Sequence, residues 1–356
     1  MPAVTEGQPA PVASFESSRE LLFGVAYRVL GSVTDAEDVV QEAWLRWDRV
    51  DHARIADPRS FLVQVTTRLA LDRLRWAKAR REAYVGQWLP EPLPTGPAIE
   101  DGAEIADSVS VAMLVVMETL SPLERVVFVL REAFEFSFAD IAVMVGRSEA
   151  AVRQLARRAR SHVRERRPRF RQDRDVRRRV TERFLAACLG GDLRALLDLL
   201  APEVTLCIDG NGRRGVARNR VEGAEKVGRL LVRGLRRVLR PDGAVVAETG
   251  DAGDDAGDDT RGDTRGDTGS GSVVDVNGGP AALITAGGEP IAVIVVDVDL
   301  AADRVTRIWI IANQDKLGGV EGRRPGRPRP VRAAGRRAAR EATRRLGPGR
   351  TETTFE

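Results

Sequence analysis

Hydrophobic residues in the first part of the chain recur at the spacing of helices that pack through one face. The first such run places six residues on one side of a helix: Leu21, Leu22, Val25, Ala26, Val29 and Leu30. A second helix is expected from Thr34, where Glu37 completes a capping-box pattern. Asp57 followed by Pro58 is typical of an N-cap and a first helical residue, so a third helix is expected there. These signals predict an all-α block.

Residues 138–157, FADIAVMVGRSEAAVRQLAR, have the pattern of a helix-turn-helix. The small Ala142 permits two helices to approach closely, and Gly146 can adopt the left-handed conformation of the turn. The shared core is expected from Ile141, Val152 and Leu155, and the N-caps from Ser137 and Ser148. An unrelated amphipathic helical hairpin would imitate some of these features, but the agreement of five positions and two caps favours DNA binding.

The pattern changes after Arg177. Two short helices (180–189 and 193–200), a strand (204–208) and a longer helix (221–239) come before β-branched strands near 245–247, 281–285, 291–298 and 305–311. Helices followed by strands with Gly-rich turns predict an α+β domain with an antiparallel sheet. Residues 249–272 are rich in Asp and Gly, and their irregular spacing favours a solvated insertion over a calcium site.

Composition and these patterns together divide the chain into six segments. They are a disordered 1–14, a helical block at 15–81, a linker at 82–106, a second helical block at 107–170, the α+β domain at 176–317, and a basic, disordered tail at 318–356. The helix in the middle of the second block is expected to start at the capping box Ser121-Pro122-Leu123-Glu124.

Positive charge is local rather than global. The chain of 356 residues has a formal net charge of +4, but residues 147–171 hold ten arginines against two glutamates. Residues 321–356 hold eleven arginines against four glutamates, so the rest of the chain is slightly acidic. Two cysteines and two histidines make a zinc site or a disulfide framework improbable, and neither a metal nor a cofactor is expected. No apolar run is long enough to span a membrane, and a soluble cytoplasmic protein is expected.

Taken together, the two helical blocks resemble sigma-70-family initiation factors of the extracytoplasmic-function group. Residues 35–42, DAEDVVQE, are similar to the acidic helix that these factors dock on core RNA polymerase, and residues 59–75 are similar to the helix that follows it. Residues 120–167 resemble region 4, which reads the −35 element of a promoter. The resemblance implies that core RNA polymerase and promoter DNA are the partners.

Three short motifs resemble those of a narrower group, in which the sigma factor is fused to a SnoaL-like domain of the ketosteroid-isomerase-like, cone-shaped fold. The first is the linker motif Trp88-Leu89-Pro90-Glu91-Pro92. The second is Asp209-Gly210-Asn211-Gly212-Arg213, which has asparagine and arginine where the group has glycine and lysine. The third is Asn313-Gln314-Asp315-Lys316-Leu317, which has glutamine in place of proline. These motifs are expected to form a regulatory contact between domains.

The resemblance assigns candidate contacts by region. The polymerase contacts are Asp35, Asp38, Gln41, Glu42 and Trp44. The −35 contacts are Ser148, Glu149, Arg153, Gln154 and Arg157, with Arg158 and Arg160 as phosphate contacts. The −10 contacts are Arg68, Arg73, Arg75 and Trp76, with Lys78 beside them, because aromatics stack on bases and cations follow phosphates; core packing explains Trp76 equally well. Arg49, Asp51, His52 and Arg54 are candidates to capture an unstacked base, and core packing or solvation explains each of them equally well.

Two other functions stay open at this point. A one-component repressor or activator would use the helix-turn-helix without polymerase, but it would need no acidic helix. A SnoaL-type enzyme would need a base and an oxyanion donor, and both tyrosines and both histidines lie outside the α+β domain. Asp209 is the one carboxylate there that invites a catalytic role, so the domain is expected to be regulatory and not an enzyme. Whether its pocket binds a small molecule is left open.

Overall fold

The structure is a computed structural model that describes residues 11–82, 84–95, 110–166, 174–213, 216–239, 269–299 and 302–320. All of these belong to one compact unit, Met1–Glu321. The other residues, including the expected strand at 245–247 and nearly all of the insertion and the tail, lie outside the described part.

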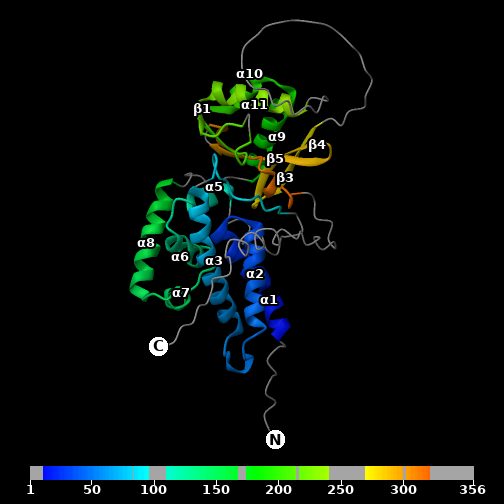
Figure 1. The fold of residues 1–356 in the computed structure, drawn as a ribbon. Helices are drawn as coiled ribbons and strands as arrows, with labels where there is room; N and C mark the ends of the chain where they lie inside the picture. The colour runs from blue at the N-terminus through cyan, green and yellow to red at the C-terminus, as the bar shows by residue number, and fades with distance from the viewer. Residues whose placement is uncertain are drawn as a thin grey trace, which may run out of the picture. The chain divides into compact units, whose positions relative to one another are not determined.

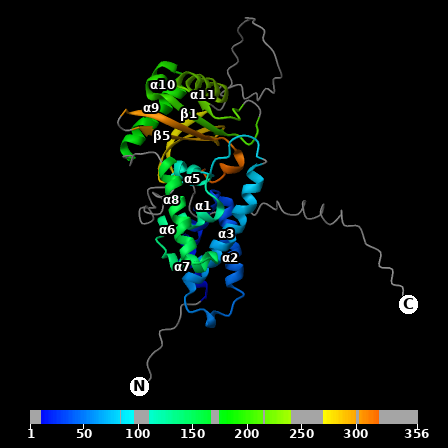
Figure 2. The same ribbon diagram turned by 90° about the vertical axis from the view of Figure 1, so that its left-hand side faces the viewer.

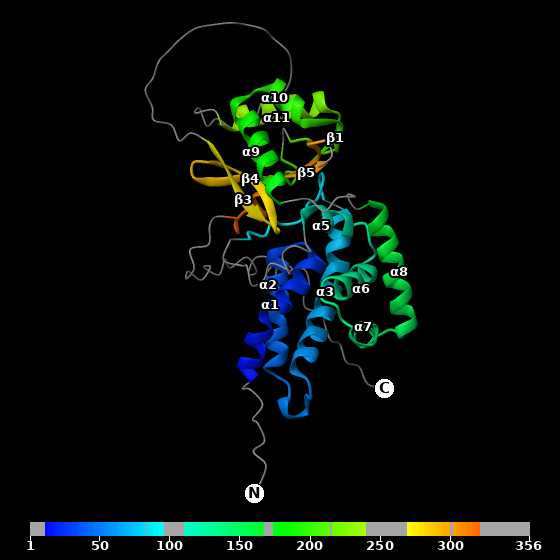
Figure 3. The same cartoon turned by 180° about the vertical axis from the view of Figure 1, so that it is seen from behind.

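The N-terminal bundle consists of α1 (Pro11–Leu30), α2 (Val33–Trp47), the short η1 (His52–Arg54) and α3 (Pro58–Glu82), which lie side by side in Figure 3. Asp57 caps α3 as expected, because its carboxylate accepts the Ser60 N–H at 3.2 Å. Two expectations are wrong. The N-cap of α2 is Ser32, whose hydroxyl accepts the Asp35 N–H, and not Thr34. Residues 11–14 are helical rather than disordered, since the Trp47 indole N–H anchors the Pro11 carbonyl at 2.8 Å.

The helix-turn-helix domain consists of α5 (Val111–Met117), α6 (Pro122–Glu132), α7 (Phe138–Val145) and α8 (Glu149–Arg166), and it lies on the side that faces the viewer in Figure 2. The expected capping box of α6 is present, and the two serine caps of α7 and α8 bond as predicted. Gly146 ends α7 with φ 64° and ψ 45°, the left-handed conformation that the turn requires. Ala142 and the three aliphatic residues of the motif are buried.

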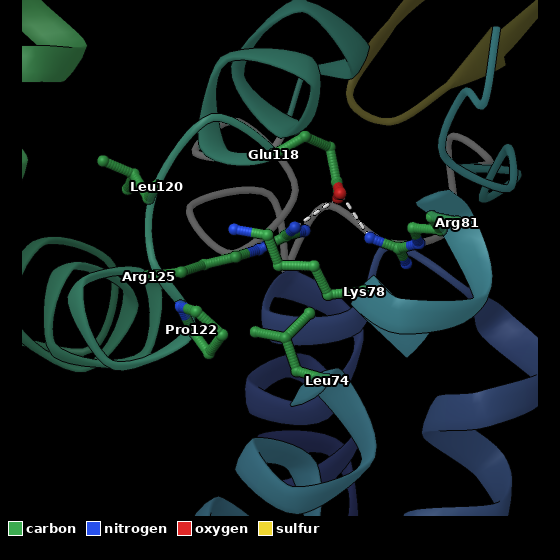
Figure 4. A pocket seen from close by; sticks show the side chains of 7 residues that line it. All are labelled: Leu74, Lys78, Arg81, Glu118, Leu120, Pro122 and Arg125. Carbon is green, nitrogen blue, oxygen red and sulfur yellow. Dashed lines mark hydrogen bonds and ion pairs between the residues drawn. The ribbon is translucent and has the colours of Figure 1, made fainter. Parts of the chain in front are cut away.

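The two helical blocks share a single hydrophobic core, to which α1, α2, α3, α5, α6, α7 and α8 all contribute. Glu118, which follows α5, forms ion pairs with Arg81 of α3 and with Arg125 of α6 (Figure 4). Arg125 is fully buried and also donates to the Arg28 carbonyl of α1 at 3.2 Å and 3.3 Å. A buried charge is tolerated only when it is paired in this way, so the cluster fixes one mutual arrangement of the blocks.

The C-terminal domain is α+β. Its helices are α9 (Arg174–Gly190), α10 (Leu193–Leu199) and α11 (Ala224–Leu239), and they cover one face of a six-stranded sheet (Figure 1). The strands are β1 (Leu200–Asp209), β2 (Val221–Glu222), β3 (Ser270–Val276), β4 (Gly279–Ala286), β5 (Glu289–Asp299) and β6 (Arg304–Ile311), followed by η3 (Gln314–Lys316), in the order β2-β1-β6-β5-β4-β3.

Four details of the C-terminal part differ from the expectation. The sheet is mixed, because β1 pairs parallel to β6 after the chain has crossed over through α11. Val221 and Glu222 pair with β1 instead of starting the helix. Strand β3 begins at Ser270, inside the range expected for the insertion, because pairing with β4 begins there. Val320, expected in the disordered tail, is buried.

The face of the sheet opposite the helices is apolar and is covered by other parts of the chain. Leu89 of the linker and Val111 and Ala112 of α5 pack there with sheet residues that include Val295 and Trp309. The linker and the helix-turn-helix domain therefore complete a core of the C-terminal domain.

Replacing Gly146 with alanine should destabilise the protein by about 1–2 kcal/mol, because a Cβ is unfavourable at this positive φ although there is room for it. Gly234, inside α11, also has open space around its Cβ position. Gly234→Ala should stabilise the protein by up to about 1 kcal/mol, because alanine is the better helix former. Chemical denaturation monitored by circular dichroism checks both, and equal effects of the same sign would contradict the backbone explanation.

Candidate functional sites

The acidic face of α2 is exposed but is held by α3. Asp38, Gln41 and Glu42 face solvent, whereas Asp35 is half-buried. Arg73 of α3 donates to Asp35 Oδ1 at 2.9 Å and to Asp38 Oδ2 at 2.6 Å. Glu42 pairs with Arg46 at 2.8 Å within α2. This face therefore presents carboxylates next to a paired arginine.

The expected aromatic contact on α2 is partly buried and packs against the core. Trp44 packs edge-on against Phe15 of α1, with ring centroids 4.9 Å apart. The exposed apolar residue beside the acidic face is instead Leu45, whose exposed fraction is 47%. Leu45 lies four residues after Gln41 and thus follows it on the same side of the helix.

The candidate −10 residues on α3 differ in whether they bond to another helix. Trp76 is 77% exposed, so the alternative of core packing for this ring is excluded. Arg75 bonds to Asp72 of its own helix. Arg68, however, donates to the carbonyls of Met144 and Val143 at 3.2 Å and 3.4 Å, so it caps the end of α7.

In the loop that follows α2, His52 packs on Trp47 with ring centroids 4.4 Å apart. Arg54 pairs with Asp51, and both side chains are exposed. Arg49 is exposed as well. The exposed residues remain candidates for capturing a base, whereas His52 has a packing role.

The arginines of α8 differ in how they are held. Arg153 pairs with Glu149 at 2.5 Å and lies 5.5 Å from the Phe138 ring centroid. Two others reach back to α6, since Arg158 pairs with Glu124 at 2.9 Å and Arg160 with Glu132 at 2.7 Å. Gln154 and Arg157 are exposed. The N-terminal half of the helix thus presents hydrogen-bonding groups to solvent.

The three short motifs meet at Asp209, whose side chain is fully buried at the end of β1. Its Oδ2 accepts the Leu89 N–H at 2.9 Å and the Lys316 ammonium at 2.6 Å. Its Oδ1 accepts the Tyr84 hydroxyl at 2.5 Å. Lys316 also donates to the Leu89 carbonyl at 2.5 Å. The Asp209 carboxylate, which belongs to the second motif, therefore joins the linker to the third motif.

We call Asp209 with its partners Tyr84, Leu89 and Lys316 the Asp209 hub. The other motif residues pack around it. Asn313 donates to the Tyr84 hydroxyl at 3.1 Å, and Asp315 accepts from Asn211 at 3.4 Å. Leu317 is buried in the core that contains Leu89. A Cβ at Gly210 would overlap Val216, and one at Gly212, whose φ is 72°, would lie 3.1 Å from Val85 of the linker. Close approach thus favours glycine at 210, and the positive φ favours it at 212.

Two cations contact the Trp88 ring. The Arg81 guanidinium is 3.4 Å from the centroid of its ring system and the Lys316 ammonium is 4.2 Å from it. A Cβ at Gly31, at the end of α1, would lie 3.0 Å from Trp88. Cations over an aromatic face are attracted by the ring quadrupole, so Trp88 connects α3 to the last motif of the chain.

Glu91 connects the linker to the N-terminus of α2. Its Oε2 accepts the Val33 N–H at 2.8 Å, the Thr34 N–H at 3.2 Å and the Ser32 hydroxyl at 3.1 Å. A carboxylate at a helix N-terminus satisfies free N–H groups and interacts favourably with the helix dipole. Pro90 and Pro92 on either side of it are also buried.

Sequence reasoning missed several members of these contacts. Tyr27 donates to the Glu91 carbonyl at 2.8 Å and accepts from Asn277, which lies between β3 and β4, at 2.6 Å. Asn277 also exchanges hydrogen bonds with Leu93, and Pro94 pairs with Val276. The Asn-Gly-Gly turn signal at 277 marked the hairpin but could not reveal its partner.

The ionisation of the hub follows from burial. Burial and the hydrogen bond to Asp209 raise the pKa of Tyr84, so its hydroxyl keeps its proton and donates at neutral pH. Burial lowers the pKa of Lys316, and the negative charge of Asp209 counteracts that effect. Burial also raises the pKa of Glu91, against the stabilising hydrogen bonds from the start of α2. Because both oxygens of Asp209 are committed to fixed donors, its geometry is structural rather than that of a general base.

The comparisons with known proteins agree with this architecture. Residues 15–80 match the family model of sigma-70 region 2, and residues 110–163 match that of sigma-70 region 4. The ECF RNA polymerase sigma factor SigJ of Mycobacterium tuberculosis is 46% identical over 225 residues, which cover 62% of this chain and 72% of that protein. A probable ECF RNA polymerase sigma factor of the same species, SigI, is 38% identical over 226 residues, which cover 62% of this chain and 76% of that protein.

The crystal structure of Mycobacterium tuberculosis SigJ aligns with a TM-score of 0.63 at 36% identity, covering 86% of this chain and 98% of that one. No helix in the described part of the chain is long and apolar enough to cross a membrane. The relatives are sigma factors and not enzymes, and this chain is a member of the extracytoplasmic-function RNA polymerase sigma factors.

Proposed function

We propose that this sigma factor binds core RNA polymerase through the acidic face of α2, reads the −10 element with the C-terminal half of α3, and reads the −35 element with the N-terminal half of α8. We assign region 2 to residues 15–81, region 4 to 107–170 and the regulatory SnoaL-like domain to 176–317. That domain acts by holding the two sigma regions together through the linker.

The observation that carries the regulatory part is the Asp209 hub. The linker joins region 2 to region 4, and Asp209 binds the linker through a tyrosine hydroxyl, a backbone N–H and a shared lysine. A free enzyme would have no use for such contacts. By contrast, a regulatory domain that fixes the linker limits how far the two sigma regions can separate.

The packed arrangement and simultaneous reading of both promoter elements exclude each other. The −10 and −35 elements are about 25 base pairs apart, which is ~85 Å of B-DNA at about 3.4 Å per base pair. Arg68 bonds to Met144. Trp76 is only about 12 Å along α3 from Arg68, and Arg153 can be at most ~32 Å of extended chain from Met144. The regions must therefore separate before both can reach their elements, and the hub opposes that separation.

For region 4, we expect the exposed residues Arg153, Gln154 and Arg157 to contact base edges. Arg157→Ala should cost about 1–3 kcal/mol of promoter affinity and relax the preference at one base pair. Arg160→Ala, which removes a residue that we assign to phosphate, should weaken promoter and scrambled duplexes alike. Equilibrium binding of the saturated holoenzyme to both duplexes checks this. If Arg157→Ala weakens binding to both duplexes equally, Arg157 contacts phosphate and not a base edge.

For the hub, Tyr84→Phe removes the hydrogen bond to the charged Asp209, worth ~1.5–3 kcal/mol, together with the hydrogen bond that the hydroxyl accepts from Asn313, while the substituted residue itself lies in the linker. We expect the population of the open state to rise by roughly ten- to a hundredfold, and transcription from a cognate promoter at limiting sigma factor to rise. Asp209→Asn should act in the same direction and more strongly, because it leaves Lys316 buried without its counter-charge.

Asp198→Asn is the matched control, because Asp198 is exposed on α10 and belongs to none of these contacts. In vitro transcription with purified core polymerase, together with a fluorescence distance between region 2 and region 4, gives the readout. If Tyr84→Phe lengthens that distance but lowers transcription, the domain supports the sigma regions instead of restraining them. An unchanged distance and unchanged transcription would contradict the regulatory role altogether.

A further inference from the structure

We propose that Arg73 is a positioning residue for polymerase binding and not a DNA contact: it orients the carboxylates of Asp35 and Asp38 for a cationic partner on the polymerase. The inference rests on the proposed docking of α2 and refines it. It also moves Arg73 out of the set of −10 contacts that the sequence suggested.

The geometry is that of a bridge between two helices. Arg73 Nε donates to Asp35 Oδ1 at 2.9 Å, and an Nη of the same guanidinium donates to Asp38 Oδ2 at 2.6 Å. The three side chains are all partly exposed, so the bridge lies at the surface of the bundle. Each carboxylate uses one oxygen for Arg73, which leaves Asp35 Oδ2 and Asp38 Oδ1 to accept from a second cation.

The physical benefit is pre-organisation. Asp35 and Asp38 lie three residues apart on α2, so their like charges repel each other unless a cation lies between them. The planar guanidinium fixes both carboxylates at once, which a point charge such as an ammonium does less well. Ordering a flexible side chain on binding costs about 0.5–1.5 kcal/mol, and a side chain that is already ordered avoids that cost.

The contrast with its neighbours argues against a DNA role for Arg73. Trp76 is 77% exposed, and Arg75 pairs with Asp72 of its own helix. Both can turn toward a nucleic acid without breaking a contact to another helix. Arg73 would have to give up two ion pairs with α2 to reach a phosphate.

The test measures the affinity of the full-length chain for core RNA polymerase. Arg73→Ala should weaken binding by about fivefold, the ordering cost of one to two side chains. Arg73→Lys should lose less, because the ammonium retains one of the two ion pairs. Arg59→Ala, on the exposed first turn of α3, should leave core affinity unchanged. Thermal unfolding of each variant separates a loss of folding from a loss of binding.

A double-mutant cycle decides the mechanism. In an Asp35→Ala, Asp38→Ala background, Arg73→Ala should have no further effect on core affinity, because there is nothing left to orient. Additive losses would overturn the positioning role. If Arg73→Ala leaves core affinity intact but impairs opening of the −10 element by saturated holoenzyme, Arg73 is a DNA contact. If the Asp35→Ala, Asp38→Ala variant itself binds core polymerase normally, the proposed docking of α2 fails, and the role of Arg73 fails with it.

Discussion

The packed state of this protein depends on keeping one buried carboxylate satisfied. Asp209 has no exposed surface, and an uncompensated charge there would cost several kcal/mol. Its donors come from the linker (Tyr84 and Leu89), from the last motif of the chain (Lys316) and from its own motif (the Asn211 N–H). Moving the linker away would therefore remove two of these four donors at once, which makes the hub a cooperative restraint rather than a set of independent contacts.

The linker is held at two places by different chemistry. At the Asp209 end it supplies donors, whereas at Glu91 it supplies an acceptor for the first N–H groups of α2. Both tyrosines of the chain serve this junction, Tyr84 at the hub and Tyr27 beside Glu91. The segment between regions 2 and 4 thus contacts both the bundle and the C-terminal domain. A displacement of the linker at one of these contacts therefore affects the other.

The sequence predicted local features well and long-range partners poorly. Ser121, Ser137 and Gly146 could be assigned because capping and turn chemistry depend only on a few neighbouring residues. The sheet was expected to be antiparallel throughout, since the parallel pairing of β1 with β6 depends on residues more than 100 positions apart. Tyr84, Asn277 and Arg125 were not singled out for the same reason. The motif residues at 88–92, 209–213 and 313–317 were found only through the family resemblance, and their meeting place required the structure.

Two arginines that the family resemblance assigned to DNA show why charge does not settle a role. Arg68 satisfies the last carbonyls of α7, and Arg73 bridges two aspartates of α2, so both stabilise contacts inside the protein. The first of these contacts holds region 4 on region 2 and must break before the regions separate. The second lies wholly within region 2 and survives that separation. Opening therefore frees Arg68 for a new partner but leaves Arg73 in place, so the two residues differ in what they can do once polymerase and promoter are engaged.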